Sequence, residues 1–161
     1  MENFTKRLIS HCIDRKLSIS IAESCTGGMI VSKLISIPGA SRVIDCGLTT
    51  YSNLSKELFL NVPKNSIHKH GAVSHQVAEL MVKGLRNKIK SDLYISITGI
   101  AGPNGGSKKK PIGTVYHSFS VFNDKKIITI KKKYTGSRFN IRLNATIFTI
   151  KQSYKILYSF I

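Results

Sequence analysis

A hydroxyl and a thiol stand side by side in the segment Glu23-Ser24-Cys25-Thr26-Gly27-Gly28. Residues 18–22 alternate between polar and apolar, which predicts a strand before this segment, and residues 29–37 predict a helix after it. A glycine turn between a strand and a helix presents free backbone N–H groups, which attract an anion or the oxyanion of a tetrahedral intermediate. Ser24 therefore stands where a serine nucleophile is needed.

The same turn also has a purely structural interpretation. Ser24 or Thr26 can cap the following helix, while Gly27 and Gly28 only allow the chain to turn tightly. The segment matches neither the nucleophile-elbow nor the phosphate-loop pattern, so the local residues alone favour the structural role. Cys25 is a second candidate nucleophile because a helix N-terminus lowers the pKa of a thiol, although a small buried thiol is the simpler interpretation.

A serine nucleophile needs a base, and no histidine stands near Ser24 in a recognisable order. Lys56 is a candidate, since burial can lower the pKa of a lysine from about 10.4 toward neutrality. Tyr51, which ends a predicted strand over residues 43–51, can relay or orient the proton. Spacing alone is weak support, because the chain has many lysines and most helix lysines are exposed.

Two further groups of residues could bind ligands. Arg138 and Arg142 lie one turn apart at the beginning of a predicted C-terminal helix, where they can grip a phosphate together or be ordinary surface residues. His68, His70 and His75 suggest a metal site, but the glycine among them and the lack of a matching carboxylate cluster favour solvated loop histidines. We therefore expect no metal and no other cofactor.

Helices and strands alternate along the chain, and the residues above lie at strand ends. Residues 93–97 predict a third strand, which runs into a second glycine-rich turn over residues 98–106. Ligands in α/β folds bind at the carboxyl ends of strands, so both glycine-rich turns indicate one site. The other predicted elements are helices over residues 3–16, 55–60, 74–90 (with Ser74 as N-cap) and 138–158, a surface excursion from 63 to 71, and a hairpin of 112–122 and 126–134 around Asn123-Asp124.

This order of elements predicts an α/β fold, a three-layer α/β/α sandwich around a mixed, mostly parallel sheet. The chain has 161 residues, of which 42% are hydrophobic, so we expect a single domain over residues 1–161. No segment is typical of a signal peptide or a membrane span, and the three cysteines contain no CxxC pair. We therefore expect a cytoplasmic protein without membrane contact.

The formal net charge of +17 is unusual and suggests nucleic acid as a partner. However, lysines greatly outnumber arginines and Trp is absent, whereas nucleic-acid recognition favours arginine forks and aromatic platforms. We expect the lysine runs at 108–110 and 131–133 to be solvated loop and strand-edge residues, and we do not expect nucleic acid to be the main partner.

Seven segments spread over nearly the whole chain carry a more specific pattern: residues 23–28, 38–41, 50–53 with Lys56, 70–74, 98–103, 111–115 and 136–142. Together, in this order, they resemble the CinA C-terminal domain family in its stand-alone form. Larger members of that family add an N-terminal domain that resembles molybdopterin-binding proteins and is associated with a metal-dependent pyrophosphatase activity. We carry over neither that activity nor its metal.

The resemblance implies an amidase that hydrolyses the carboxamide of nicotinamide mononucleotide to nicotinate mononucleotide and ammonia. By motif, Ser24 is the expected nucleophile, with Tyr51 and Lys56 as its proton-transfer partners. The expected substrate-binding residues are Thr26, Gly27, Gly28, Thr98, Gly99, Ala101, Gly102, Arg138 and Arg142. The resemblance also favours a homodimer or larger homo-oligomer. Two alternatives stay open, namely a non-catalytic nucleotide-binding regulatory module of the CinA type and DNA association through the basic C-terminal third.

Overall fold

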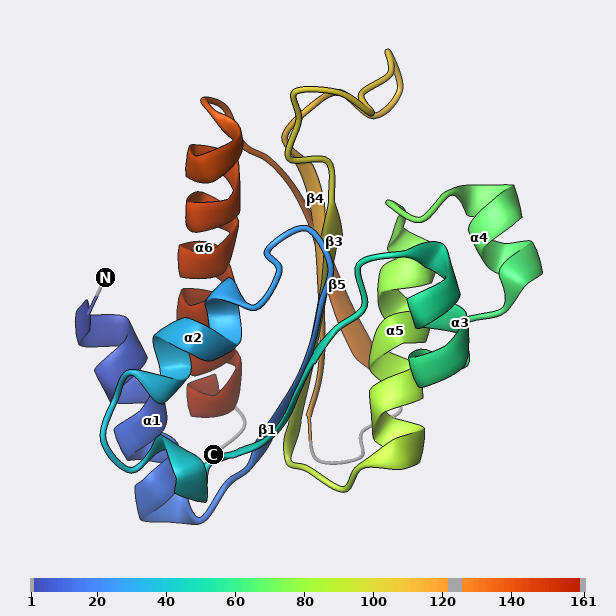
Figure 1. Cartoon of the computed structure of the whole chain (residues 1–161). Coiled ribbons are helices and arrows are strands. Elements are labelled where there is room, and N and C mark those ends of the chain that lie inside the picture. Colours follow the sequence, from blue (N-terminus) through green and yellow to red (C-terminus); the bar gives the residue numbers. More distant parts are fainter. Residues whose placement is uncertain (1, 122–125, 160–161) are drawn as a thin grey trace.

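The computed structural model describes residues 2–121 and 126–159. Within these residues, five strands form one sheet (Figure 1). The strands are β1 (Ile19–Glu23), β2 (Ile44–Thr49), β3 (Leu93–Gly99), β4 (Thr114–Val121) and β5 (Ile127–Lys133). Their order is β2-β1-β3-β4-β5, with β1 parallel to both β2 and β3, and with β4 antiparallel to both β3 and β5. The predicted mixed sheet is confirmed, although among these strands the parallel pairs make up half of the pairings rather than most of them.

Helices cover both faces of the sheet, as the prediction of three layers requires. The helices are α1 (Glu2–Arg15), α2 (Met29–Ile35), α3 (Asn53–Leu60), α4 (Lys64–His70), α5 (His75–Lys88) and α6 (Arg138–Ser159), with a short 3-10 turn at Ala40–Arg42. Figure 1 shows α1, α2 and α6 on one face and α3, α4 and α5 on the other. Each side has its own apolar cluster against the sheet. Burial of these two clusters removes most of the apolar surface from water and stabilises the sandwich.

The sheet has a fully buried centre and partly exposed edges. Every residue of β1 and β4 is buried, whereas β2 alternates between half-buried and exposed positions. The other edge strand, β5, ends in the exposed Lys131, Lys132 and Lys133. Charged side chains at a sheet edge discourage pairing with another chain, so these lysines lie where the sequence predicts them.

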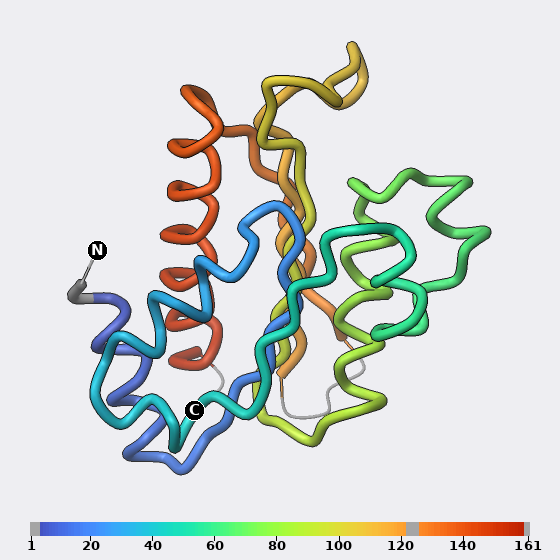
Figure 2. The backbone as a smooth tube through the Cα atoms, in the orientation of Figure 1, coloured from blue at the N-terminus to red at the C-terminus, as the bar shows by residue number. Residues whose placement is uncertain are grey.

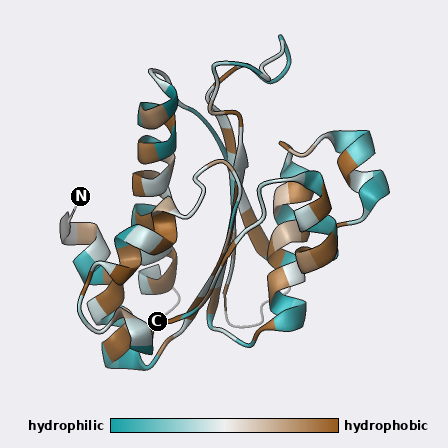
Figure 3. Ribbon diagram, viewed as in Figure 1, coloured by the Kyte–Doolittle hydropathy of each residue, from teal (hydrophilic) through white to brown (hydrophobic). Residues whose placement is uncertain are grey.

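The chain differs from the prediction at one helix. Residues 63–71, expected as a surface excursion, contain α4, which begins after Pro63. Figure 3 shows this helix to be mostly hydrophilic, and Ile67 is its buried residue. A helix that buries a single apolar residue has no periodic stripe, which explains why periodicity did not indicate it.

Two other expectations concern turns. Ser74 caps α5 as predicted, since its hydroxyl accepts a hydrogen bond from the amide of Val77 at 3.2 Å. The antiparallel register of β4 and β5 confirms the hairpin, while its turn at Asn123-Asp124 lies outside the described residues. Among the residues described, no helix combines the length and the apolar character that crossing a bilayer requires.

The turns after β1 and β3 lie at the same end of the sheet. Figure 2 shows both turns at the upper end of the view, together with the N-terminal end of α6. The two strands are parallel neighbours, so their carboxyl ends must meet at one edge. The topology thus brings Ser24, which directly follows β1, close to the glycine-rich turn that follows β3.

Candidate active site

A cavity of about 230 Å³ opens where the turns after β1 and β3 meet. Its walls come from both turns, from the segment before and within α3, from the α4–α5 connection and from the beginning of α6. The lining residues are Ser24, Cys25, Tyr51, Lys56, Ala72, Val73, Thr98, Gly99, Ala101 and Arg138. The three residues expected to be catalytic therefore share one cavity.

The amine of Lys56 contacts the hydroxyl of Ser24. Its Nζ atom donates to Ser24 Oγ at 3.1 Å, and the side chain is only 1% exposed. The same Nζ donates to backbone carbonyls, most closely to that of Thr50 at 2.7 Å. Burial lowers the pKa of Lys56 from 10.5 to about 8, because desolvation penalises the ammonium form. A fraction of this amine is therefore neutral near pH 7 and can accept a proton.

Helix α3 places Lys56 in this position. The hydroxyl of Ser52 caps the helix by accepting from the amide of Ser55 at 3.0 Å. Lys56 then lies at the end of the first turn, on the buried side of a helix that packs against α5, with Leu60 buried one turn later. Exposed residues such as Leu54 and Leu58 occupy the outer face. The buried face of a short capped helix thus directs the lysine inward to the end of β1.

Tyr51 lies at the mouth of the cavity. Its side chain is 60% exposed, and its hydroxyl accepts a hydrogen bond from Arg138 Nη2 at 2.8 Å. Among the described contacts, the Tyr51 hydroxyl bonds to neither Ser24 nor Lys56, and the residue contacts Lys56 through its backbone carbonyl at 3.4 Å. Arg138 also donates to the carbonyl of Gly102 at 2.6 Å. Tyr51 and Arg138 therefore form a linked pair at the cavity, with the Tyr51 side chain exposed and the Lys56 amine buried.

A buried carboxylate occupies the N-terminus of α2. Glu23, which is fully buried, accepts hydrogen bonds from the amides of Gly28, Ile30 and Val31 at 3.0, 3.2 and 2.9 Å. The expectation that this helix N-terminus attracts an external anion is wrong, because the side chain of Glu23 already satisfies those donors. Glu23 is a residue that sequence reasoning missed, although an acidic residue directly before a glycine turn and a helix was a signal for such a cap.

The amides earlier in the turn are differently placed. Ser24 N donates to the carbonyl of Ile97 at 3.0 Å, and Gly27 N donates to the carbonyl of Ser24 at 3.1 Å. Among the backbone hydrogen bonds of the described residues, the amides of Cys25 and Thr26 donate to no carbonyl. Cys25 lines the cavity and Thr26 directly follows it, so these two N–H groups are the donors that the turn can offer to a developing oxyanion beside Ser24.

The two arginines do not act as a pair. Arg138 lines the cavity, but Arg142 is absent from its wall. Instead, Arg142 Nε donates to the carbonyl of Cys25 at 3.0 Å, and Nη2 donates to the carbonyl of Thr26 at 2.7 Å. Of the two roles that the sequence leaves open for this pair, a joint grip on a phosphate does not fit this arrangement, because Arg142 is bound to the turn that follows β1.

The remaining predicted binding residues divide into two groups. Thr98, Gly99 and Ala101 line the cavity, and Thr98 Oγ1 donates to the carbonyl of Ala72 at 2.9 Å. The residues expected at the site but outside its wall are Thr26, Gly27, Gly28 and Gly102. A Cβ at position 99 would lie 2.7 Å from Val115 and 3.0 Å from the sulfur of Cys25, so only glycine fits there. Ala72 and Val73 line the cavity without having been predicted, although the motif at residues 70–74 pointed to their segment.

The thiol beside Ser24 is poorly placed as a nucleophile. Burial raises the pKa of Cys25 to about 12, so the reactive thiolate is scarce at neutral pH. Ser24, whose hydroxyl contacts a lysine amine, is the better candidate. The expectation that the three histidines are loop residues is wrong, because His68 and His70 lie in α4 and His75 begins α5, where it pairs with Glu79 at 3.0 Å. The described residues contain no group of three metal-binding side chains.

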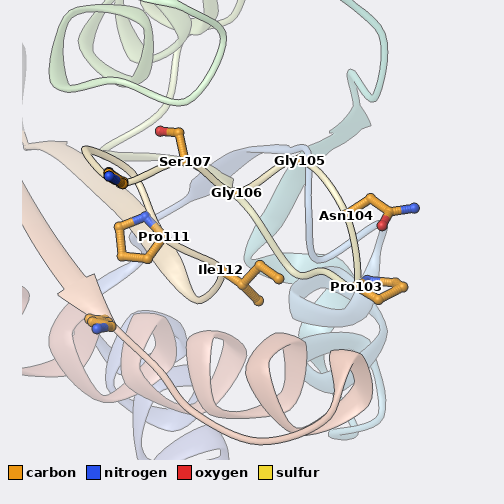
Figure 4. Close-up of a pocket in the computed structure, with 9 residues that line it drawn as sticks. Pro103, Asn104, Gly105, Gly106, Ser107, Pro111 and Ile112 are labelled. Atoms are coloured by element: carbon orange, nitrogen blue, oxygen red, sulfur yellow. The ribbon is translucent and has the colours of Figure 1, made fainter.

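A second, wider hollow lies in the loop between β3 and β4. Figure 4 shows the loop residues around this hollow, which has a volume of about 640 Å³. The lining residues are Pro103, Asn104, Gly105, Gly106, Ser107, Lys108, Pro111, Ile112 and Lys133. In the same loop Lys110 is half-buried rather than solvated, because its Nζ donates to the carbonyl of His70 at 2.6 Å. The loop is thus fastened to the end of α4, directly before the segment that lines the candidate active-site cavity at Ala72 and Val73.

Known proteins are similar to this chain over most of its length. A family model described as the CinA C-terminal domain matches residues 1–157. A CinA-like protein from Petrotoga mobilis is 47% identical over 81% of this chain and 32% of its own length. A CinA-like protein from Thermotoga maritima is 40% identical over 98% of this chain and 37% of its own length. The chain therefore spans about a third of the length of these curated relatives.

Solved structures show the same arrangement of elements. A competence-damaged protein (CinA) superfamily protein from Klebsiella pneumoniae superimposes with a TM-score of 0.92 at 28% identity, over 98% of each chain. A competence/damage inducible protein from Agrobacterium tumefaciens gives a TM-score of 0.89 at 34% identity, over 98% of this chain and 93% of that one. By its match to the family model, its relatives and its fold, the chain belongs to the CinA C-terminal domain family.

Proposed function

We propose that the protein is an amidase that hydrolyses the carboxamide of nicotinamide mononucleotide, giving nicotinate mononucleotide and ammonia. The observation that carries this proposal is the buried Lys56 amine, 3.1 Å from the Ser24 hydroxyl in a cavity and with a pKa lowered to about 8. A serine beside a neutral lysine is a nucleophile with its base, the arrangement that acyl transfer requires. The family resemblance supports the choice of substrate.

In the first half of the reaction, neutral Lys56 takes the proton of the Ser24 hydroxyl. The Oγ atom then forms a bond to the carboxamide carbon, and the carbonyl oxygen becomes an oxyanion that the free amides of Cys25 and Thr26 stabilise. When the intermediate collapses, the C–N bond breaks and Lys56 returns the proton to the leaving nitrogen. The products of this half are ammonia and an ester on Ser24.

In the second half, water replaces the hydroxyl as the nucleophile. Lys56, neutral again, takes a proton from water, and the oxygen attacks the ester carbon. The C–Oγ bond breaks, and Lys56 returns the proton to Ser24. The acid is released as its carboxylate, so the net reaction consumes one water and produces one ammonium ion.

Arg138 is the group best placed to recognise the charged end of the substrate. It lines the cavity and donates hydrogen bonds to the Tyr51 hydroxyl and to the carbonyl of Gly102. Its guanidinium has further N–H groups that can bind a phosphate. Tyr51 would hold this arginine and take part in proton transfer once the substrate fills the entrance. The binding energy of a phosphate outside the reacting centre can serve to position the carboxamide at Ser24.

The experiment that tests this function is ammonia release from a panel of four amides: nicotinamide, its riboside, its mononucleotide and the dinucleotide NAD. We expect kcat/KM to be highest for the mononucleotide and far lower for free nicotinamide, which lacks the phosphate. Ammonia from none of the four, with calorimetry showing that the mononucleotide binds, would instead support the non-catalytic regulatory module.

We further propose that the chain works as a homo-oligomer in a reducing compartment such as the cytoplasm. Large apolar side chains on the outer face of α3 support the first point, since Leu54, Leu58 and Phe59 are more than half exposed. The free thiols of Cys12, Cys25 and Cys46 support the second. Light scattering of the wild type and of Leu58→Lys tests the assembly, because a charge in a buried apolar contact should shift it to the monomer.

A further inference from the structure

We propose that Arg142 is a positioning residue that orients the oxyanion-binding amide next to Ser24, and that it does not bind the substrate's phosphate. The proposal rests on the proposed amidase function, because that reaction passes through an oxyanion beside Ser24. It assigns a role to an arginine that would otherwise count as a second phosphate ligand. The argument comes from the two carbonyls that this side chain holds.

One guanidinium holds two consecutive carbonyls of the nucleophile turn. Arg142 Nε donates to Cys25 O at 3.0 Å, and Nη2 donates to Thr26 O at 2.7 Å. Because the guanidinium is planar and rigid, the two oxygens must keep a fixed spacing and direction to be bound together. The turn cannot rotate either peptide unit without losing one of these bonds.

Fixing the carbonyls also fixes the amides on the other side of each peptide unit. In a trans peptide, the C=O of Cys25 and the N–H of Thr26 belong to one plane and point in opposite directions. Because the Arg142 guanidinium lies on the carbonyl side of this peptide unit, the Thr26 N–H points away from the guanidinium. The next amide, Gly27 N–H, already donates to the Ser24 carbonyl, so Thr26 N–H is the oriented donor that stays free within the described contacts.

The positive charge strengthens this donor as well as aiming it. A charged group bonded to a carbonyl polarises the peptide unit and makes its N–H a better donor, since linked hydrogen bonds reinforce each other. The effect is larger where water is excluded, and Arg142 is half-buried against the buried Cys25. The arginine would thus stabilise negative charge beside Ser24 without touching the substrate.

The surroundings of Arg142 fit a structural attachment better than a ligand site. Its side chain is absent from the cavity wall, whereas Arg138, one turn earlier on α6, lines it. Ile141 and Ala145 are buried on the same helix, which holds α6 rigidly against the sheet. A Cβ at Gly27 would lie 3.3 Å from Arg142 Nη2, so the lack of a side chain at this position lets the guanidinium approach the turn closely.

The test compares Arg142→Met, Arg142→Lys and Arg138→Met on two substrates, nicotinamide mononucleotide and its unphosphorylated riboside. Removing an oxyanion donor costs about 10²- to 10³-fold in kcat, so we expect Arg142→Met to approach that loss on both substrates, with KM within about twofold. Arg142→Lys keeps the charge and one carbonyl bond, and should recover part of the rate. Arg138→Met should raise KM for the phosphorylated substrate alone. Arg15→Met, an exposed arginine on α1, is the matched control for loss of one charge.

A second readout does not depend on the amide substrate. A fluorophosphonate reacts with an activated serine: the Ser24 Oγ–P bond forms, fluoride leaves, and Lys56 takes the proton. We expect mass spectrometry to find the label on Ser24, at least tenfold slower in Arg142→Met, with the midpoint of its pH dependence unchanged. If wild-type protein is labelled but releases no ammonia, the proposed substrate is wrong while the role of Arg142 is still measured.

Two results would overturn the role proposed for Arg142. The first is a rise in KM confined to the phosphorylated substrate in Arg142→Met, which would make Arg142 a phosphate ligand. The second is labelling of Ser24 at the wild-type rate in Arg142→Met. If the methionine variant does not fold, as judged by circular dichroism, Arg142→Lys decides, and wild-type kcat and labelling in that variant refute the proposal.

Discussion

The lowered pKa of Lys56 makes the proposed reaction depend on pH in a specific way. Because the neutral amine is the base, kcat/KM should follow its neutral fraction. With a pKa of about 8, that fraction is about one tenth at pH 7, one half at pH 8 and nine tenths at pH 9. We therefore predict a rise of about tenfold between pH 7 and pH 9, followed by a plateau. An ordinary lysine, with a pKa of about 10.4, would give a rise of about a hundredfold over the same interval.

The assay is ammonia release from nicotinamide mononucleotide at concentrations far below KM, in steps from pH 6.5 to pH 10. In that range the substrate phosphate, with a second pKa of about 6, is mostly dianionic and adds little pH dependence of its own. Lys56→Arg is the matched variant, since a guanidinium keeps its proton throughout and cannot act as the base. We expect this variant to lose activity at every pH. A flat profile in the wild type, or a rise that continues beyond pH 9.5, would refute the assignment of Lys56 as a desolvated base.

Three other predictions concern stability. His117 is buried between Thr149 and Tyr134, and burial lowers its pKa to about 3. The stability that the neutral imidazole contributes to the fold is therefore present above pH 6.5 and is lost as the pH falls. Urea unfolding should show a loss of about 2 kcal/mol between pH 6.5 and 4.5 that His117→Gln lacks. Burial lowers the pKa of Lys56 from 10.5 to about 8, so the folded state binds this proton more weakly than the unfolded state does. Thermal melts should therefore show the stability of the wild type rising by about 3 kcal/mol from pH 8 to 10.5, relative to Lys56→Met. In urea unfolding, Glu23→Ala should lower the free energy of unfolding by about 3 kcal/mol, because it leaves three amides unpaired. The control Glu79→Ala, which removes an exposed ion pair, should lower it by less than about 1 kcal/mol. Equal losses in the two variants would refute the capping role.

The sequence predicts the parts of this molecule that follow from periodicity and turn chemistry. Buried strands over β1 and β3, the two glycine-rich turns and the Ser74 cap are all visible as local patterns, and the parallel pairing of β1 with β3 brings their ends together. These features place Ser24 at the edge of the sheet. They do not depend on any distant side chain.

The missed features depend on contacts between distant segments. The desolvation of Lys56 arises only when α3 packs against α5 and brings the lysine to the end of β1, so no spacing distinguishes this lysine from the others. Arg142 contacts carbonyls 116 and 117 residues away in the chain, and a pair of arginines one turn apart suggests a phosphate grip more readily than such a contact. Glu23 was the exception, because its cap lies within eight residues and could have been predicted.

The central claim, that Ser24 is the nucleophile of an amide hydrolysis, is tested most directly by a single-turnover measurement with protein in excess over nicotinamide mononucleotide. The account predicts that the wild type and Cys25→Ser both release one ammonia per substrate, while Ser24→Ala, folded by circular dichroism, releases none above the uncatalysed rate. Release by Ser24→Ala at the wild-type rate, or its loss in Cys25→Ser alone, would contradict the claim.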